Sequence, residues 1–153
     1  MYTTRKQTVH LIDSGIDPES ADMMVIAGRG KDPFSNWNPI AKTPENCKKH
    51  LGKDFMPAWS DEALINILPR EVINPDMVID DRLTGEEINL RYDFNIKKRI
   101  IPGRGKFNLV SYNDPTGGPT HAAYLSPSLT EALVLMVVEM MCNREKNLTN
   151  YVW

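Results

Sequence analysis

The sequence contains few of the features that identify a protein class. Cys47 and Cys142 are its only cysteines among 153 residues. Two cysteines are too few for a disulfide framework, so we expect reduced thiols. Eighteen basic and 20 acidic side chains leave a net charge of −2. A chain that is nearly neutral overall does not indicate any particular class of partner. No apolar run reaches the roughly 20 residues of a membrane span, and residues 1–7 hold no signal-peptide core. These absences predict a cytoplasmic protein without a membrane partner.

A complete catalytic or metal-binding motif is also missing. Gly28–Lys31 and Gly103–Lys106 both read Gly-Arg-Gly-Lys, but neither has the spacing of a Walker phosphate loop, and glycine turns explain both. Cys47 and His50 have the separation of half a zinc site, without a second pair. His121 could act as a general base only inside a pocket with convergent polar groups. We therefore expect no metal, no cofactor and no enzymatic activity.

The length of the chain predicts one domain, residues 1–153, because a chain of this size buries roughly two-thirds of its unfolded surface. Residues 28–57 show no lasting helical or strand period and are interrupted by prolines. We expect a long irregular loop there, longer than a simple connection. Either this loop is partly disordered, or aromatic side chains pin it and make it a candidate binding loop; these are Phe34, Trp37, Phe55 and Trp59.

Capping patterns predict three helices before the middle of the chain. Thr4 and Gln7 form a capping box, and Gly15 is suited to the end of that first helix. Asp17 followed by Pro18 predicts a second helix that ends near Gly28. Ser60 before two acidic residues predicts a short third helix, which a proline ends at position 69.

Strands and one long helix are predicted for the second half. Apolar residues alternate with polar ones from Ile88 to Ile96, which is typical of a strand with one face in a core. Turns then separate expected strands at 107–112 and 121–125, and a further strand is expected at 77–80. Ser128 begins a helix whose residues 132–138 are all apolar. The predicted fold is α+β: an antiparallel meander of three to four strands, a long C-terminal helix on one face and short N-terminal helices.

An ordered set of short motifs gives a resemblance. The motifs are Ser20-Ala21-Asp22-Met23, Pro57-Ala58-Trp59-Ser60 with Ala63, Leu64 and Leu68-Pro69, Val110-Ser111-Tyr112, and Ser126-Pro127 through Glu131-Ala132. In this set the chain resembles small uncharacterised proteins of phages, prophages and other mobile elements of gut Bacteroidales. It departs from them in its longer, proline-rich segment from 28 to 57. The resemblance implies a phage-related accessory protein and assigns no site.

Basic residues gather around the turn at 102–105, with no acidic residue between Asp93 and Asp114. A basic two-stranded ribbon can lie along nucleic-acid phosphates, so the sequence predicts a candidate nucleic-acid surface. The alternative is a solvated hairpin whose charges protect a sheet edge from aggregation. The candidate residues are Lys97, Lys98, Arg99, Arg104 and Lys106.

Aromatic and methionine side chains predict a second kind of surface. Such residues are enriched at interfaces, where they supply large or adaptable apolar area. The candidate interface residues are Trp37, Trp59, Met140, Met141, Tyr151 and Trp153. Our first expectation is a non-enzymatic accessory protein that binds another protein or itself, as a homodimer for example. The alternative function is nucleic-acid binding through the basic hairpin.

Overall fold

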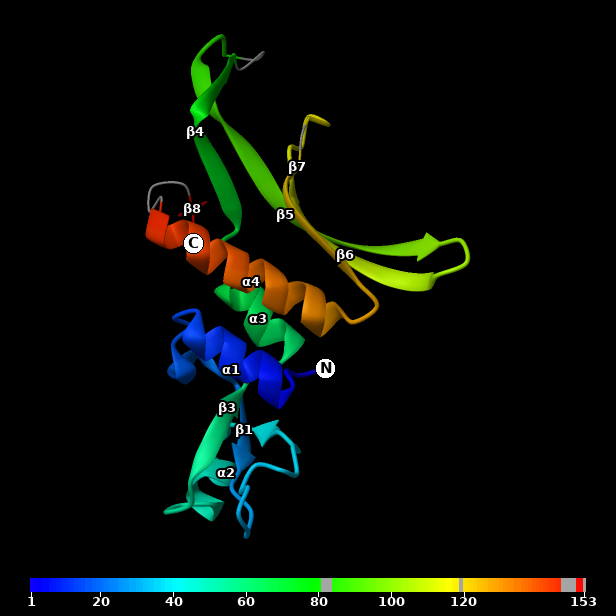
Figure 1. Cartoon of the computed structure of the whole chain (residues 1–153). Helices are drawn as coiled ribbons and strands as arrows, with labels where there is room; N and C mark the ends of the chain where they lie inside the picture. The colour runs from blue at the N-terminus through cyan, green and yellow to red at the C-terminus, as the bar shows by residue number, and fades with distance from the viewer. Residues whose placement is uncertain (81–83, 119, 147–150, 153) are drawn as a thin grey trace. The chain divides into compact units, whose positions relative to one another are not determined.

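In the computed structural model the chain divides into two compact units, Met1–Ile67 and Leu68–Trp153. Figure 1 shows helices and antiparallel strands along the chain, which confirms the predicted α+β class. The structure describes residues 1–80, 84–118, 120–146 and 151–152, with the backbone alone for 74–80, 88, 144–146 and 151–152. One domain for the whole chain stays a prediction.

The first unit combines a small sheet with short helices. Antiparallel strands pair in the order β2, β1, β3. The elements in chain order are α1 (Arg5–Asp13), a 3₁₀ turn at Pro18–Ser20, β1 (Met23–Ile26), β2 (Ile40–Ala41), α2 (Pro44–Lys49), β3 (Phe55–Ala58) and α3 (Asp61–Ile67). Segment 28–57, expected to be irregular, therefore contains α2 and the pairing partners of β1.

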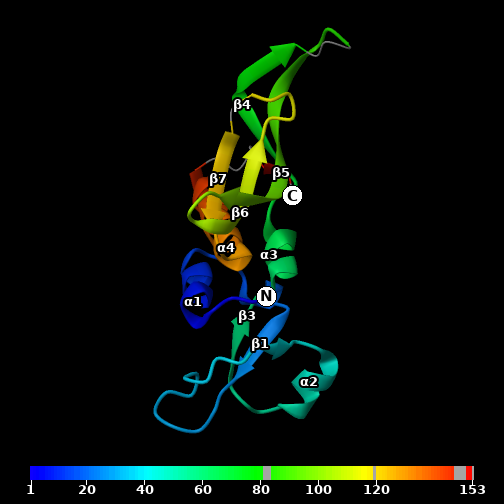
Figure 2. The ribbon, with the colours of Figure 1, turned by 90° about the vertical axis from the view of Figure 1, so that its right-hand side faces the viewer.

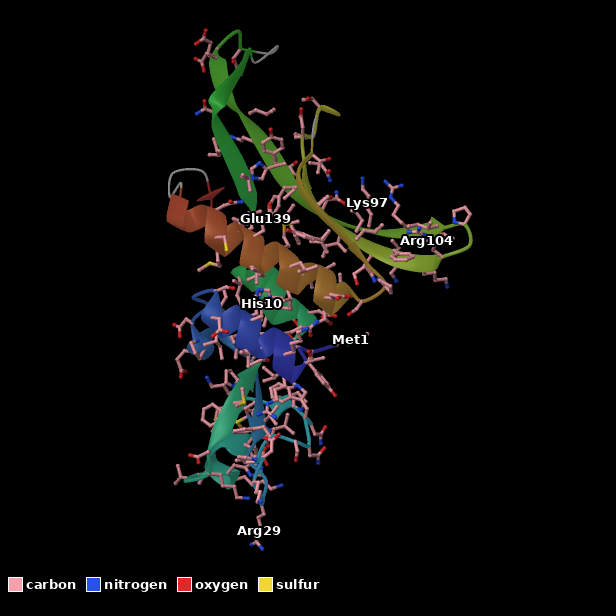
Figure 3. All side chains as sticks on the ribbon, in the orientation of Figure 1. Met1, His10, Arg29, Lys97, Arg104 and Glu139 are labelled. Carbon is pink, nitrogen blue, oxygen red and sulfur yellow. The ribbon has the colours of Figure 1, made fainter. Side chains whose placement is uncertain are left out.

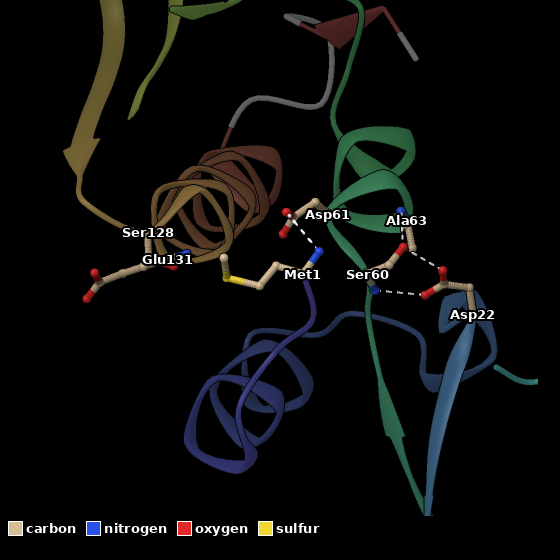
Figure 4. A network of polar contacts seen from close by, with 7 residues as sticks. All are labelled: Met1, Asp22, Ser60, Asp61, Ala63, Ser128 and Glu131. Atoms are coloured by element: carbon tan, nitrogen blue, oxygen red, sulfur yellow. Dashed lines mark hydrogen bonds and ion pairs between the residues drawn. The ribbon is translucent and has the colours of Figure 1, made fainter. Parts of the chain in front are cut away.

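The predicted caps of α1 and α3 are confirmed. The Thr4 hydroxyl accepts a hydrogen bond from the Gln7 backbone N–H, and the Gln7 side chain accepts one from the Thr4 N–H at 2.9 Å. Gly15 follows α1 with a φ of 87°, a conformation that glycine adopts without strain. At α3, the Ser60 hydroxyl accepts from the Ala63 N–H and donates to the Asp22 carboxylate at 2.5 Å (Figure 4).

The helix predicted from Asp17 to Gly28 is wrong. The Asp17 cap and Pro18 produce only one 3₁₀ turn, and the apolar residues that follow form β1. β1 pairs with a strand on each side, Met24 with Ile40 and with Pro57. Two sets of sheet hydrogen bonds and the burial of Met24 and Val25 therefore outweigh the local helix signal.

Thr3 ties distant segments of the first unit together. Its backbone N–H donates to the Trp59 carbonyl at 2.9 Å, and its hydroxyl accepts from the Trp59 N–H at 3.0 Å. The Trp37 indole N–H donates to the Thr3 carbonyl at 2.8 Å. Of the two predicted states of segment 28–57, the structure has the one in which Trp37 pins the segment.

The second unit is built on a five-stranded antiparallel sheet in the order β7, β6, β5, β4, β8. The strands are β4 (Glu71–Asp80), β5 (Glu87–Ile101), β6 (Gly105–Asn113), β7 (Thr120–Ser126) and the two-residue β8 (Tyr151–Val152). Strands β4 to β7 follow one another as the predicted meander. β4 pairs with β5 at residues 87–93, and β6 pairs with β5 at residues 93–101. The two neighbours of β5 thus take opposite halves of it, as Figures 1 and 2 show.

The long helix α4 (Leu129–Lys146) packs on β6 and β7, as predicted. The Tyr124 hydroxyl of β7 donates to the Glu139 carboxylate of α4, and the Ser126 hydroxyl donates to Glu131 at 2.5 Å. Buried side chains line the contact on both sides, among them Val110, Tyr112, Leu133, Met136 and Met140. The Tyr112 hydroxyl donates to the Pro69 carbonyl at 2.5 Å, which ties β6 to the start of the unit.

Loss of the α1 capping box tests the first unit. We expect Thr4→Ala to lower the free energy of unfolding by about 1 kcal/mol, because the Gln7 N–H loses its acceptor. Thr4→Ser keeps the hydroxyl, so we expect its free energy of unfolding to lie within a few tenths of a kcal/mol of the native value. Urea unfolding of the three proteins measures the difference, and equal losses in both variants would contradict the capping role.

Candidate nucleic-acid interface

The predicted basic residues lie on one hairpin, here named the basic arm (residues 97–107). β5 and β6 pair along it without a shift in register, from Lys97 opposite Leu109 to Ile101 opposite Gly105. β7 reaches only as far as Asn108, so the end of the arm is a two-stranded ribbon. Figure 3 shows Lys97 and Arg104 on this arm, which extends away from α4.

The turn at the end of the arm follows from its sequence. Pro102 fixes φ for the first central position, and Gly103 has a φ of 73° at the second. The Arg104 N–H donates to the Ile101 carbonyl at 3.0 Å, which closes the turn. Gly103-Arg104-Gly105-Lys106 is therefore a hairpin turn, as predicted, and its backbone forms no phosphate loop.

Positive charges cover both faces of the basic arm. Lys97 and Arg99 lie on one face, and Lys98 lies on the other with Lys106, whose register partner is Ile100. All five cationic side chains are exposed, counting Arg104 in the turn. Within the described part of the chain none of them forms an ion pair. The structure thus brings together the whole predicted basic set, with its charges facing solvent.

The other half of β5 and its partner strand carry the opposite charge. Residues 71–93 contain seven acidic and two basic side chains, a net charge of −5, whereas residues 94–113 contain five basic and no acidic ones. The two segments meet near Asp93, which pairs with Glu71 of β4 and with Asn113 of β6. The pairing places the acidic strand β4 beside residues 87–93 of β5 and leaves the basic residues on the other half, where β6 pairs.

The predicted interface residues differ in how far the structure buries them. Trp59 and Met140 are fully buried and add nothing to the surface of the chain, while Trp37 is half-buried and held by its hydrogen bond to Thr3. Met141 is half-buried on α4. Trp153 and the side chain of Tyr151 lie outside the described residues. Of the four candidates whose side chains are described, only Trp37 and Met141 therefore reach the surface, and each does so in part.

The first unit contains a small cleft that the sequence did not predict. It measures about 340 Å³ and is lined by residues that include Arg29, Asn36, Asn38 and His50. His50 Nδ1 is buried there without a hydrogen-bond partner.

The Gly28–Lys31 segment does not form a phosphate loop with its first glycine. The Gly28 N–H already donates to the Pro33 carbonyl at 2.7 Å, so it is not available to a phosphate. No group of three metal-ligating side chains occurs among the described residues.

His121, the candidate general base, lies near the start of β7 beside an aromatic ring of β5. Its ring lies 5.2 Å from the Tyr92 ring, and the nearby Tyr124 hydroxyl donates to Glu139. His121 stays accessible to solvent, yet desolvation by its neighbours lowers its pKa below 6.5, an effect that the Glu139 carboxylate partly offsets. Burial and the bond to Glu139 raise the pKa of Tyr124 to about 12. The contact between the His121 and Tyr92 rings is typical of packing.

Comparisons with known proteins add no relative: a scan of family models, a search of curated proteins and a search of solved structures found no match. The resemblance to phage and prophage proteins therefore stays a prediction. Among the described residues, no helix has the length and apolar character needed to cross a bilayer.

The lowered pKa of His121 predicts a pH dependence of stability. Between about pH 6.5 and its folded-state pKa, the unfolded chain binds more protons at this site, so stability falls as the pH falls. We expect His121→Gln to lose less thermal stability than the native protein between pH 7 and pH 5. Comparing each protein with itself at two pH values cancels any cost of the substitution that does not depend on pH. Equal losses in the two proteins would contradict this assignment.

Proposed function

We propose that this chain is a non-enzymatic binding protein whose basic arm binds the phosphates of nucleic acid. The supporting observation is the group of five exposed cations on a projecting hairpin, none with an ion-pair partner among the described residues. Lysine and arginine on such a ribbon match the spaced negative charges of a phosphate backbone.

The net charge of the chain does not oppose this proposal. Glu87 and Lys97 are ten residues apart on a continuous strand, which corresponds to roughly 33 Å. Asp93 is four residues from Lys97, or roughly 13 Å. The Debye length at physiological ionic strength is about 8 Å, so the acidic half of β5 is largely screened from the arm.

The side chains of the arm favour contact with the backbone over reading of bases. Ammonium and guanidinium groups on two faces can follow phosphates, and they carry no sequence information when they do. The ribbon also presents apolar area, because Ile100 is 77% exposed and Phe107 is half-buried. Such side chains can stack on bases or insert at a base step. We therefore expect binding with little sequence preference.

The first expectation from the sequence, an accessory protein that binds another protein, remains a separate proposal. The burial of Trp59 and Met140 removes two of its candidate anchors. A mobile-element origin would suit either function, and it rests on the resemblance alone.

Salt dependence tests the phosphate contacts. If all five cations contact duplex DNA, the slope of log K against log salt concentration should be about −4.5, and for a single strand about −3.5. We expect Lys98→Gln, Arg104→Gln and Lys106→Gln together to make the duplex slope shallower by about 2.7. Fluorescence anisotropy with labelled duplex and single-stranded oligonucleotides at several salt concentrations measures both slopes.

The matched control removes three exposed positive charges from the first unit, Arg29→Gln, Lys48→Gln and Lys49→Gln. This variant has the same net charge as the arm variant and should keep the native slope. Equal effects of the two variants, or no binding by the native protein at low salt, would refute the proposal.

A further inference from the structure

We propose that a second copy of this chain binds to the outer face of β5, in an antiparallel, two-fold symmetric arrangement. The β5 outer face consists of Glu87, Asn89, Arg91, Asp93, Asn95 and Lys97. This inference goes beyond the nucleic-acid proposal and shares only Lys97 with it, a residue that the arm variant leaves unchanged.

Strand pairing places these six residues on one face, opposite to α4. Tyr124 contacts Glu139 of α4, and its register partner is Val110, whose own partner on β5 is Ile96. Side chains alternate along a strand, so the even-numbered residues of β5 share the face of α4 and the odd-numbered ones point away. Burial agrees, because Leu90 and Tyr92 are buried while Arg91 and Asp93 are exposed.

The outer face is complementary in charge to its own reverse. From Glu87 to Lys97 its side chains are acid, amide, base, acid, amide and base. Two antiparallel copies centred on position 92 would place Glu87 opposite Lys97, Asn89 opposite Asn95, and Arg91 opposite Asp93. In an interface with two-fold symmetry each of these pairs occurs twice. Every acid then meets a base, and each amide can both donate to and accept from another amide.

Asp93 lies in an unfavourable position on this face of the isolated chain. Asp93 is the register partner of Glu71, so two carboxylates lie side by side across β4 and β5, an unfavourable pairing. Arg91 donates to Glu71 at 3.1 Å. Among the described residues Asp93 has no ion-pair partner. A second copy would bring another arginine to Asp93, which relieves this like-charge pair.

Charge exchange between positions 87 and 97 tests the arrangement. We expect the native protein to sediment at low salt and millimolar concentration as a dimer, at twice its mass of 17.4 kDa. Glu87→Lys alone, or Lys97→Glu alone, should give monomers, because each places like charges opposite one another twice. The two variants mixed should form a heterodimer, and the two substitutions in one chain should restore the homodimer.

Neighbouring positions supply matched controls. Glu86→Lys alters an exposed acid just before β5, and Lys98→Glu alters an exposed base on the other face of the strand. Both should leave the dimer intact, and circular dichroism of each variant checks that it is folded.

Several outcomes would overturn the dimer. The proposal would be overturned by a monomeric native protein or by a dimer that persists in Glu87→Lys or Lys97→Glu alone. It would also be overturned if the two variants, when mixed, formed no heterodimer or formed oligomers larger than a dimer. The arm variant with Lys98, Arg104 and Lys106 replaced keeps the outer face, so loss of nucleic-acid binding without loss of the dimer separates this proposal from the proposed function.

Discussion

The continuity of β5 is the constraint on which the second unit depends. The strand runs for 15 residues, and different neighbours pair with its two halves. Asp93 has a register partner on each side, Glu71 and Asn113. Because side chains alternate strictly along an unbroken strand, the fold of this unit and the chemistry of its surfaces follow from the same backbone.

This arrangement separates charges that a compact sheet would bring together. Had β4 paired with residues 93–101 of β5, as β6 does, the acidic strand β4 would lie directly beside Lys97, Lys98 and Arg99. Because β4 and β6 pair with different halves of β5, the basic residues lie on a separate hairpin, the basic arm. The inner face of β5 buries Leu90 and Tyr92, and the same face is solvent-exposed from Ile96 onward.

Local signals predicted the elements whose causes are local. The capping box at Thr4, the cap at Ser60, the alternation from residue 88 to 96 and the start of α4 all correspond to hydrogen bonds or burial in the structure. The same reasoning was wrong for residues 17–28, because pairing of β1 on both edges is a tertiary effect that Asp17 and Pro18 do not encode. It also stopped β5 too early, since Lys97, Lys98 and Arg99 break the apolar alternation once both faces meet solvent.

Candidate sites were predictable in part for the same reason. The basic set is contiguous in sequence, and the structure keeps it together on one hairpin. The aromatic and methionine residues come from distant segments, and their burial depends on the tertiary fold. The charge order of the β5 outer face is present in the sequence, yet it has meaning only when one face of an unbroken strand is known to point away from α4.

Nuclear Overhauser contacts around Asp93 test the central claim, that one continuous strand joins the two halves of the sheet. The account predicts cross-strand contacts from residues at and next to Asp93 both to β4 near Glu71 and to β6 near Asn113, with slowly exchanging amides on both sides of position 93. Contacts to only one neighbour, or a break in the extended backbone between Tyr92 and Asn95, would contradict it.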